Sequence, residues 1–224
     1  MRLCLLLLAL LSAFSANAQT RVINSGFPGS NTAELDARLA RALQEFKPTY
    51  VVLFAGANDA LNEKKFLTPR QTVIHLVAMV RRIENAGAKV VMVTVHDPDV
   101  IRLMERHNPQ TYAGISPLKR LERVNVRVRE TAQRNRTLLV PFHEVLQKAG
   151  GANTELSTDG VHLTAKGYGV LATAVRAKLP KHLAANATVL CFGDSLTYGI
   201  GVRPPNNAPE PATTYPAQLR ALLR

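Results

Sequence analysis

The sequence predicts a three-layer α/β/α sandwich built around a five-stranded parallel sheet, and three observations support this fold class. Five short runs are almost entirely apolar or β-branched, as expected for strands that are covered on both faces. Amphipathic stretches alternate with these runs, which is typical of right-handed crossovers between parallel strands. The chain of 224 residues, 46% of them hydrophobic, is long enough for one well-buried domain.

The predicted strands are the apolar runs themselves, because strands buried on both faces need no polar alternation. In chain order they are Arg21–Ser25, Tyr50–Ala55, Lys89–Val95, Thr137–Phe142 and Thr188–Phe192.

The predicted helices are the amphipathic stretches between these strands, and Gly87 and Pro180 mark the ends of two of them. Two stretches without a periodic pattern, residues 96–116 and 203–216, are expected to be loops. Long loops in a compact domain often border a functional site. In chain order the helices are Thr32–Phe46, Pro69–Ala86, Pro117–Asn135, Thr164–Leu179 and Thr214–Arg224.

The first 18 residues are predicted to be a signal peptide. Arg2 gives a positive n-region, Leu3–Phe14 an apolar core, and Ala16–Ala18 a small-x-small cleavage site. The apolar core is too short to span a bilayer as a mature helix, which argues against an integral membrane protein. We therefore expect a secreted or periplasmic protein with one domain over residues 19–224. Cys191 is the one cysteine after the leader, so no intramolecular disulfide is expected.

The formal net charge of +12 makes this a basic protein. An exported protein of this charge is expected to make weak contacts with anionic envelope polymers. Many arginines recur at helical spacing, which is typical of solvated outer helix faces. No basic run carries the interleaved aromatic residues of single-stranded nucleic-acid binders, so a nucleic acid is not expected as a partner.

Residues suited to a binding site follow three of the predicted strands. In open α/β sheets, ligands bind beyond the carboxyl ends of the strands. Gly193-Asp194-Ser195-Leu196 follows the last run, Gly56-Ala57-Asn58-Asp59 the second, and Gly26-Phe27-Pro28-Gly29 the first. A further turn, Asp159-Gly160-Val161-His162, places a carboxylate and an imidazole three residues apart.

These segments together supply the parts that acyl transfer needs: a serine, an oriented base and donors for an oxyanion. Each segment alone is common, because Gly-Asp-Ser is an ordinary turn and Asn-Asp an ordinary helix cap. Their occurrence together in one chain favours a shared active site.

On these residues the sequence resembles the GDSL, or SGNH, hydrolase family of esterases and lipases. The resemblance implies Ser195 as nucleophile, His162 as general base and then acid, and Asp159 as the residue that orients His162. It also implies an oxyanion hole formed by the backbone N–H groups of Ser195 and Gly29 and the side-chain amide of Asn58. The matching blocks are Gly193–Gly199, Asn24–Thr32, Gly56–Asp59 and Asp159–Leu163.

The order of the blocks departs from the family pattern. Family members begin with the serine block, whereas Ser195 here follows the Asp159–His162 block. This resembles a circular permutation, with residues 180–187 joining the former ends. The family's sheet order, 2-1-3-4-5 as in flavodoxin, then requires the strand before Ser195 to lie inside the sheet although it comes last in the chain.

The remaining candidate residues are interpreted as structural. His96-Asp97-Pro98-Asp99 is expected to form a loop with Asx-turn contacts rather than a second acid–base pair. Gly199-Ile200-Gly201 lacks the pattern of a dinucleotide site, and Cys191 is expected to be a small buried residue. His75, His107, His143 and His182 show no metal-ligand spacing, so neither a metal nor a cofactor is expected.

We therefore expect an exported serine esterase that hydrolyses short-chain carboxylic esters, acyl or aryl, through an acyl-enzyme on Ser195. The substrate is expected to be a small-molecule or glycan ester. Alternatives within the family are a carbohydrate O-acetylesterase, a lysophospholipase or a thioesterase. A non-enzymatic alternative is a module that binds polyanions or glycans, whose binding would weaken steeply with salt.

Overall fold

The computed structural model describes residues 20–224, so the signal-peptide prediction lies outside the described residues. Five parallel strands form one sheet in the order β1-β5-β2-β3-β4. The strands are β1 (Arg21–Gly26), β2 (Tyr50–Phe54), β3 (Lys89–Val93), β4 (Leu138–Val140) and β5 (Thr188–Gly193).

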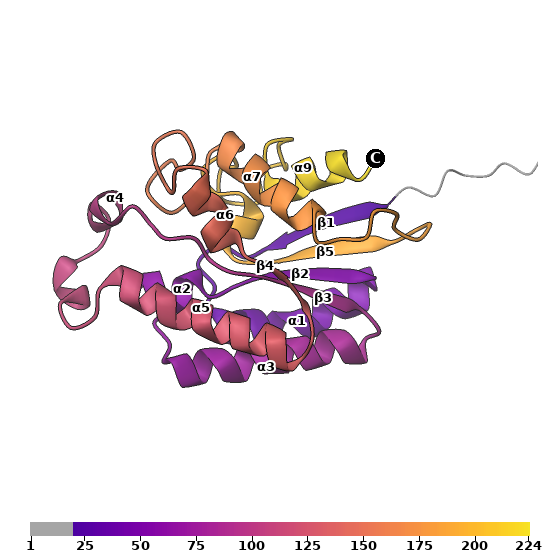
Figure 1. The fold of residues 1–224 in the computed structure, drawn as a ribbon, viewed down its shortest axis with the longest axis horizontal. Helices are drawn as coiled ribbons and strands as arrows, with labels where there is room; N and C mark the ends of the chain where they lie inside the picture. The colour runs from indigo at the N-terminus through magenta and orange to yellow at the C-terminus, as the bar shows by residue number, and fades with distance from the viewer. Residues whose placement is uncertain (1–19) are drawn as a thin grey trace, which may run out of the picture.

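Helices cover both faces of this sheet, which confirms the predicted three-layer sandwich. Figure 1 shows the helices α1 (Thr32–Phe46), α3 (Pro69–Asn85) and α5 (Pro117–Arg134) on one face. On the other face lie α6 (Phe142–Lys148), α7 (Ala165–Arg176) and α9 (Tyr215–Leu222). Short helices fill several connections: α2 (Ala57–Leu61), α4 (Val100–Met104), the 3₁₀ helix η1 (Pro109–Tyr112) and α8 (Ser195–Tyr198).

Local sequence explains where the longer helices begin. Asn31 caps α1 in a capping box with Glu34, and Thr68 caps α3 in the same way with Gln71. Thr164 and Thr214, which the sequence predicted as first helical residues, are instead the N-caps of α7 and α9.

The fourth strand is shorter than predicted. The run Thr137–Phe142 was expected to be extended throughout, but β4 ends at Val140 and Phe142 already begins α6. Pro141 stands between them and has no N–H to donate to a ladder. The stretch 96–116, predicted to be a loop, contains α4 and η1.

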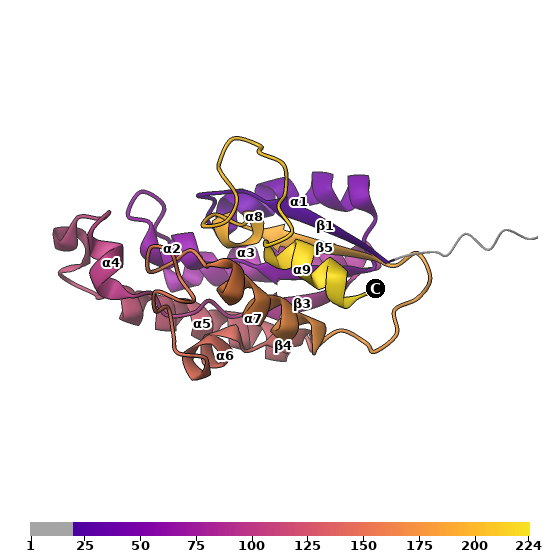
Figure 2. The same cartoon turned by 90° about the horizontal axis from the view of Figure 1, so that it is seen from above.

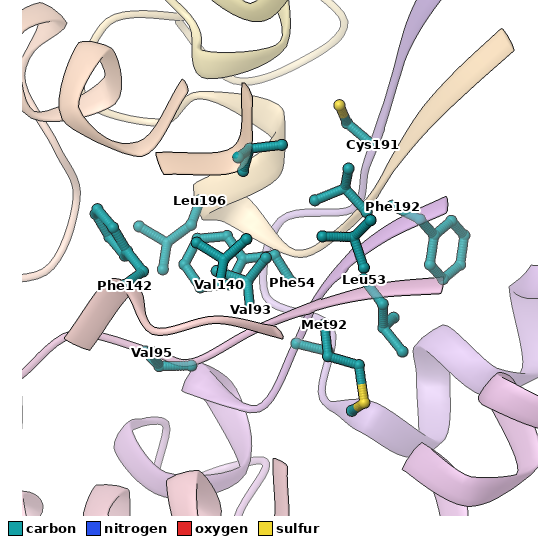
Figure 3. Close-up of a cluster of buried hydrophobic side chains, with 14 of the residues drawn as sticks. Leu53, Phe54, Met92, Val93, Val95, Val140, Phe142, Cys191, Phe192 and Leu196 are labelled. Carbon is teal, nitrogen blue, oxygen red and sulfur yellow. The ribbon is translucent and has the colours of Figure 1, made fainter. Parts of the chain in front are cut away.

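The hydrophobic core lies on both faces of the three central strands. Every residue of β2 and β5 is buried, and helix residues pack against them. Figure 3 shows part of the core, where Phe54, Phe142 and Leu196 meet above the carboxyl ends of β2, β4 and β5. This packing fixes the strand ends from which the site residues project.

Register aligns the carboxyl ends of the strands. Gly193 at the end of β5 pairs with Gly26 of β1 on one side and Phe54 of β2 on the other. The segments that follow these residues therefore emerge at one edge of the sheet, as the sequence predicted. Among residues 20–224, no helix is long and apolar enough to cross a membrane.

Candidate active site

Ser195 lies at the sharp turn from β5 into α8. The turn is tight because Gly193 approaches its neighbours closely: a Cβ at Gly193 would lie 2.1 Å from the Phe54 carbonyl oxygen. Asp194 caps α8 by accepting the N–H of Leu196 at 2.9 Å. Ser195 is the first residue of α8 and is partly exposed at the sheet edge.

Asp159 and His162 are held together by their own turn. One carboxylate oxygen of Asp159, Oδ1, accepts the N–H groups of Val161 at 2.9 Å and His162 at 2.7 Å. The other, Oδ2, lies 2.6 Å from Nδ1 of His162. The three-residue spacing therefore brings the carboxylate to the imidazole without any further element.

The structure brings this pair to Ser195. Nε2 of His162 lies 3.0 Å from Oγ of Ser195. With Nδ1–H donating to Asp159, Nε2 is left as the acceptor for the serine hydroxyl. The distances match those of a serine activated by a base that a carboxylate orients.

The carboxylate of Asp159 stays ionised. Burial by itself would raise the pKa of Asp159, but the hydrogen bond and charge of His162 outweigh it, together with the two backbone N–H groups. The pKa therefore lies well below the ordinary value. Arg106 adds a cation, with Nη1 at 3.2 Å from Oδ2 and Nη2 at 3.2 Å from the Asp159 carbonyl oxygen.

The hollow beside Ser195 contains two backbone N–H groups that have no protein acceptor within residues 20–224. Among the described residues, the N–H groups of Gly29 and Ser195 donate to no protein acceptor. Gly29 lies three residues after the end of β1 and has φ +75°, a backbone conformation that favours glycine. Both residues line the same hollow as His162.

Asn58 lines this hollow too, but its amide is engaged with protein. Its Nδ2 donates to the Ser30 carbonyl at 3.0 Å and to Oδ2 of Asp194 at 3.3 Å. Its position is fixed by Asp59, which is buried and accepts the N–H of Thr32 and the hydroxyl of Thr72, both at 2.9 Å. Burial raises the pKa of Asp59 against these hydrogen bonds.

The hollow around Ser195 has a volume of about 440 Å³. Its wall combines apolar side chains with the polar groups already described, as is usual for sites of small ligands. The charged rim comes from Glu63, Lys64 and Arg106. The apolar side chains of the wall are Pro28, Ala57, Leu61, Leu103, Val161 and Ile200.

The sequence interpretation missed Arg106, Glu63 and Leu103 as wall residues. They come from the α2–α3 connection and from the stretch 96–116, and no motif marks them. Only the position of that stretch after a strand could have suggested them, because loops after parallel strands gather at this edge.

His96 lies in the loop after β3, as expected for its segment, and its side chain is buried there. Its Nε2 lies 2.9 Å from the Val161 carbonyl oxygen, and its ring packs edge-on against Phe142. Burial lowers the pKa of His96 to about 4, so the ring is neutral and supports the backbone beside His162.

The other candidates stay outside the site or at its rim. Cys191 is buried, and burial raises its pKa to about 12, so it is a poor nucleophile. His107 lines the hollow and pairs with Glu63, whereas His75 pairs with Asp36 away from it. Within residues 20–224 no group of three or more His, Cys, Asp or Glu side chains is arranged to hold a metal ion.

Comparisons with known proteins identify the family of this chain and proteins that share its fold. A family model described as GDSL-like lipase/acylhydrolase matches residues 8–170, a range that ends before β5 and Ser195. The chain is 32% identical to the esterase TesA of Pseudomonas aeruginosa over 142 residues, which are 63% of this chain and 61% of that protein. It is 27% identical to an arylesterase of Vibrio mimicus over 162 residues, 72% of this chain and 71% of that protein. The chain thus spans less than two thirds of the first of these curated relatives.

Solved structures share the fold. A lipase/acylhydrolase from Enterococcus faecalis superposes with a TM-score of 0.55 at 24% identity, covering 66% of this chain and 69% of that one. An acetyl xylan esterase from Geobacillus stearothermophilus gives a TM-score of 0.56 at 17% identity, covering 70% and 71%.

Proposed function

This chain belongs to the GDSL-like lipase/acylhydrolase family, and on that premise we propose that it hydrolyses carboxylic esters through an acyl-enzyme on Ser195. The observation that carries the proposal is the hydrogen-bonded series from Asp159 to His162 to Ser195, facing a hollow with two unused backbone donors. The relatives named esterase and arylesterase support ester hydrolysis as the reaction.

In the first half of the reaction, Oγ of Ser195 attacks the ester carbonyl carbon while Nε2 of His162 takes the hydroxyl proton. Asp159 holds the imidazole in the required tautomer and stabilises the imidazolium that forms. The carbonyl electrons move to oxygen, which the N–H groups of Gly29 and Ser195 stabilise. When the carbon–oxygen ester bond breaks, His162 returns its proton to the leaving alcohol and the acyl group stays on Ser195.

In the second half, water attacks the acyl-enzyme and His162 takes the water proton. The second oxyanion collapses, Ser195 leaves with the proton from His162, and the carboxylic acid is released. Asn58 is the proposed third oxyanion donor. To serve, its amide must give up the longer of its two hydrogen bonds, the one to Asp194.

We favour short acyl or aryl esters as substrates because the hollow is small and its apolar wall is limited to a few side chains. Carbohydrate O-acetyl esters are the second candidate, favoured by the net charge of +12 together with the predicted leader. Export follows from the leader in residues 1–18 and is part of the proposal.

The test is hydrolysis of p-nitrophenyl acetate, butyrate, octanoate and palmitate by the chain from Gln19. Ser195→Ala and His162→Ala should each lose several orders of magnitude in kcat. Asn58→Ala should lose about 10² to 10³. Asp159→Ala should lose less, since the imidazole keeps its contact with Ser195.

The matched control is His182→Ala, an exposed histidine away from the hollow, which should retain wild-type turnover. Turnover by folded Ser195→Ala at the wild-type rate would refute the proposal. Folding of each variant is checked by circular dichroism before rates are compared.

A further inference from the structure

A second hollow, of about 510 Å³, lies beside the edge strand β1. One side is formed by α1 and the other by the loop between α8 and α9, residues 199–214. Figure 2 shows this loop on the β1 side of the sheet, where α1 also lies.

Three arginines line this hollow, which we call the arginine hollow: Arg38, Arg41 and Arg203. Among the described residues, none of the three pairs with a carboxylate within 4.0 Å. Glu45 is the one acidic residue in the wall that the structure describes, so the lining carries net positive charge.

Two of these guanidinium groups are held in place by aromatic rings. The Cζ atom of Arg38 lies 5.0 Å from the ring centre of Phe27, and that of Arg203 lies 4.1 Å from the ring centre of Tyr198. Arg203 also donates from Nε to the Ala208 carbonyl at 2.8 Å. Stacking and this bond reduce the side-chain freedom that anion binding would otherwise have to restrict.

The loop wall is fixed to the sheet by Glu210. Its carboxylate accepts hydrogen bonds from Asn24 at 2.6 Å and Thr214 at 2.8 Å, and it pairs with Arg220 at 3.1 Å. Glu210, which lies in the same loop as Arg203, is thus engaged by other residues and does not pair with Arg203. The donors of Arg203 other than Nε stay available to a ligand.

The arginine hollow and the hollow around Ser195 share a wall. Phe27 lines the first and Pro28 and Gly29 the second, although these residues are consecutive. In and just after α8, Tyr198 lines the first while Ser195 and Ile200 line the second. The segments 27–29 and 195–200 therefore have the arginine hollow on one side and the hollow around Ser195 on the other.

We propose that the arginine hollow is an anion-binding subsite that takes a carboxylate or phosphate group of the substrate. Guanidinium groups recognise both anions by paired N–H donors, and a group held there would orient the ester toward Ser195. The assignment to substrate rests on the proposed esterase function. The proposal that anions bind there depends only on the three arginines and on their having no salt bridge to a carboxylate within the described part of the chain.

Binding is measured first, with Ser195→Ala so that no probe is consumed. Galacturonate and inorganic phosphate are titrated by calorimetry, with neutral galactose beside them. The anions should bind, and the affinity should fall as NaCl is raised, whereas galactose should not bind. The stronger of the two anions identifies the source as an acidic saccharide or a phosphate ester.

The variant Arg38→Gln/Arg41→Gln/Arg203→Gln should weaken anion binding at least tenfold. Its matched control is Arg123→Gln, an exposed arginine of α5 that is unpaired among the described residues and remote from the hollow. Equal affinity in the triple variant and the control, or no anion binding by the parent protein, would overturn the proposal.

The kinetic arm compares O-acetylated oligogalacturonides with O-acetylated xylo-oligosaccharides. The ratio of their kcat/KM values should fall at least tenfold in the triple variant relative to Arg123→Gln. Anion binding without any ester hydrolysis would retain the subsite and refute the esterase function. Ester hydrolysis with the same kcat/KM ratio in the triple variant and in Arg123→Gln would support the esterase function and refute the role of the subsite in substrate binding.

Discussion

Asp194, the residue before the proposed nucleophile, is a buried carboxylate with an exposed fraction of 1%. Burial raises its pKa to about 7, against the opposing effects of the Leu196 N–H and the His162 charge. His96 is shifted in the opposite sense, to about 4, also by burial. Two ionisable groups near one site thus favour their neutral forms in the folded protein.

These two shifts have opposite consequences for stability. Between pH 4 and 7, native Asp194 keeps a proton that the unfolded chain loses, so its contribution to stability falls as pH rises. Native His96 lacks a proton that the unfolded chain gains below pH 6.5, so its contribution falls as pH drops toward 4. In the wild-type protein the two changes in stability with pH therefore partly cancel between pH 4 and 6.5.

Asp194→Asn should remove the loss of stability that Asp194 causes as the pH rises. Relative to wild type, the variant should gain stability as pH is raised from 4 to 7, by a total on the order of 4 kcal/mol. Urea unfolding at several pH values measures this difference, with the exposed Glu105→Gln as control. Parallel stability curves for variant and wild type would show that Asp194 is ionised in the native protein throughout this range.

At the residue scale the sequence identified the side chains whose chemistry is marked by local motifs. Ser195 stands in the turn after β5, whereas Asp159 and His162 stand in the turn before α7, and a short local motif marks each of the three. Arg106 was not predicted because its contact with Asp159 depends on the path of a long connection rather than on any motif.

At the element scale, residues 100–112, comprising α4 and η1, form a strap along the hollow around Ser195. Contacts along its length hold it. Arg106 pairs with Asp159, His107 pairs with Glu63, and the Tyr112 hydroxyl donates to the Leu61 carbonyl at 2.6 Å. Arg102 also donates, from Nη1 to the Ser157 carbonyl at 3.0 Å and from Nη2 to the Ala152 carbonyl. The strap thus brings a cation to the same oxygen of Asp159, Oδ2, that contacts His162.

Arg106→Gln should shift the pH profile of kcat/KM. The positive charge of Arg106 lies beside the Asp159–His162 pair, so its loss should raise the pH of half-maximal kcat/KM by a few tenths of a unit. Because the Arg106 side chain is 41% exposed, solvent screening limits the shift. The profile is measured with p-nitrophenyl acetate.

Tyr112→Phe separates charge from anchoring. It removes the hydrogen bond that holds the strap to Leu61 but leaves Arg106, His107 and Glu63 in place. We expect KM to change, whereas the pH of half-maximal kcat/KM should stay at the wild-type value. A profile shifted equally in both variants would mean that strap mobility, and not the Arg106 charge, sets it.

The longer elements were predicted well because their signals are local. α1 was predicted with the bounds Thr32–Phe46 that the structure shows, since its amphipathic pattern extends through the whole helix. The single-turn helices α2, α4 and α8 were not predicted. Helices this short are unstable alone and form only because tertiary contacts hold them, as Asp59 holds α2.

At the scale of the whole molecule, the strand that leads to Ser195 is last in the chain and lies inside the sheet, between β1 and β2. If β5 is counted first, the order β1-β5-β2-β3-β4 becomes the family order 2-1-3-4-5. The family match ends at residue 170, before the serine block. Circular permutation stays a prediction from the order of the motifs.

A version of the chain with the serine block first would test what this order costs in folding. Thr20 and Arg224 line one small surface hollow, and both views show the end marked C near the start of β1. A short added link would therefore be enough to join Arg224 to Thr20 in this version. In the present chain β5 pairs with β1 and β2 only across most of the sequence. Placing residues 188–224 before residue 20 shortens both separations and so lowers the contact order.

The relinked version should therefore refold faster than the present chain at matched stability. Until residues 188–193 join the sheet, β1 and β2 each keep an unpaired edge, which favours association between chains. Refolding is followed by stopped-flow circular dichroism at several protein concentrations. Equal folding rates, with no concentration dependence in the present chain, would show that inserting β5 last is not the slow step.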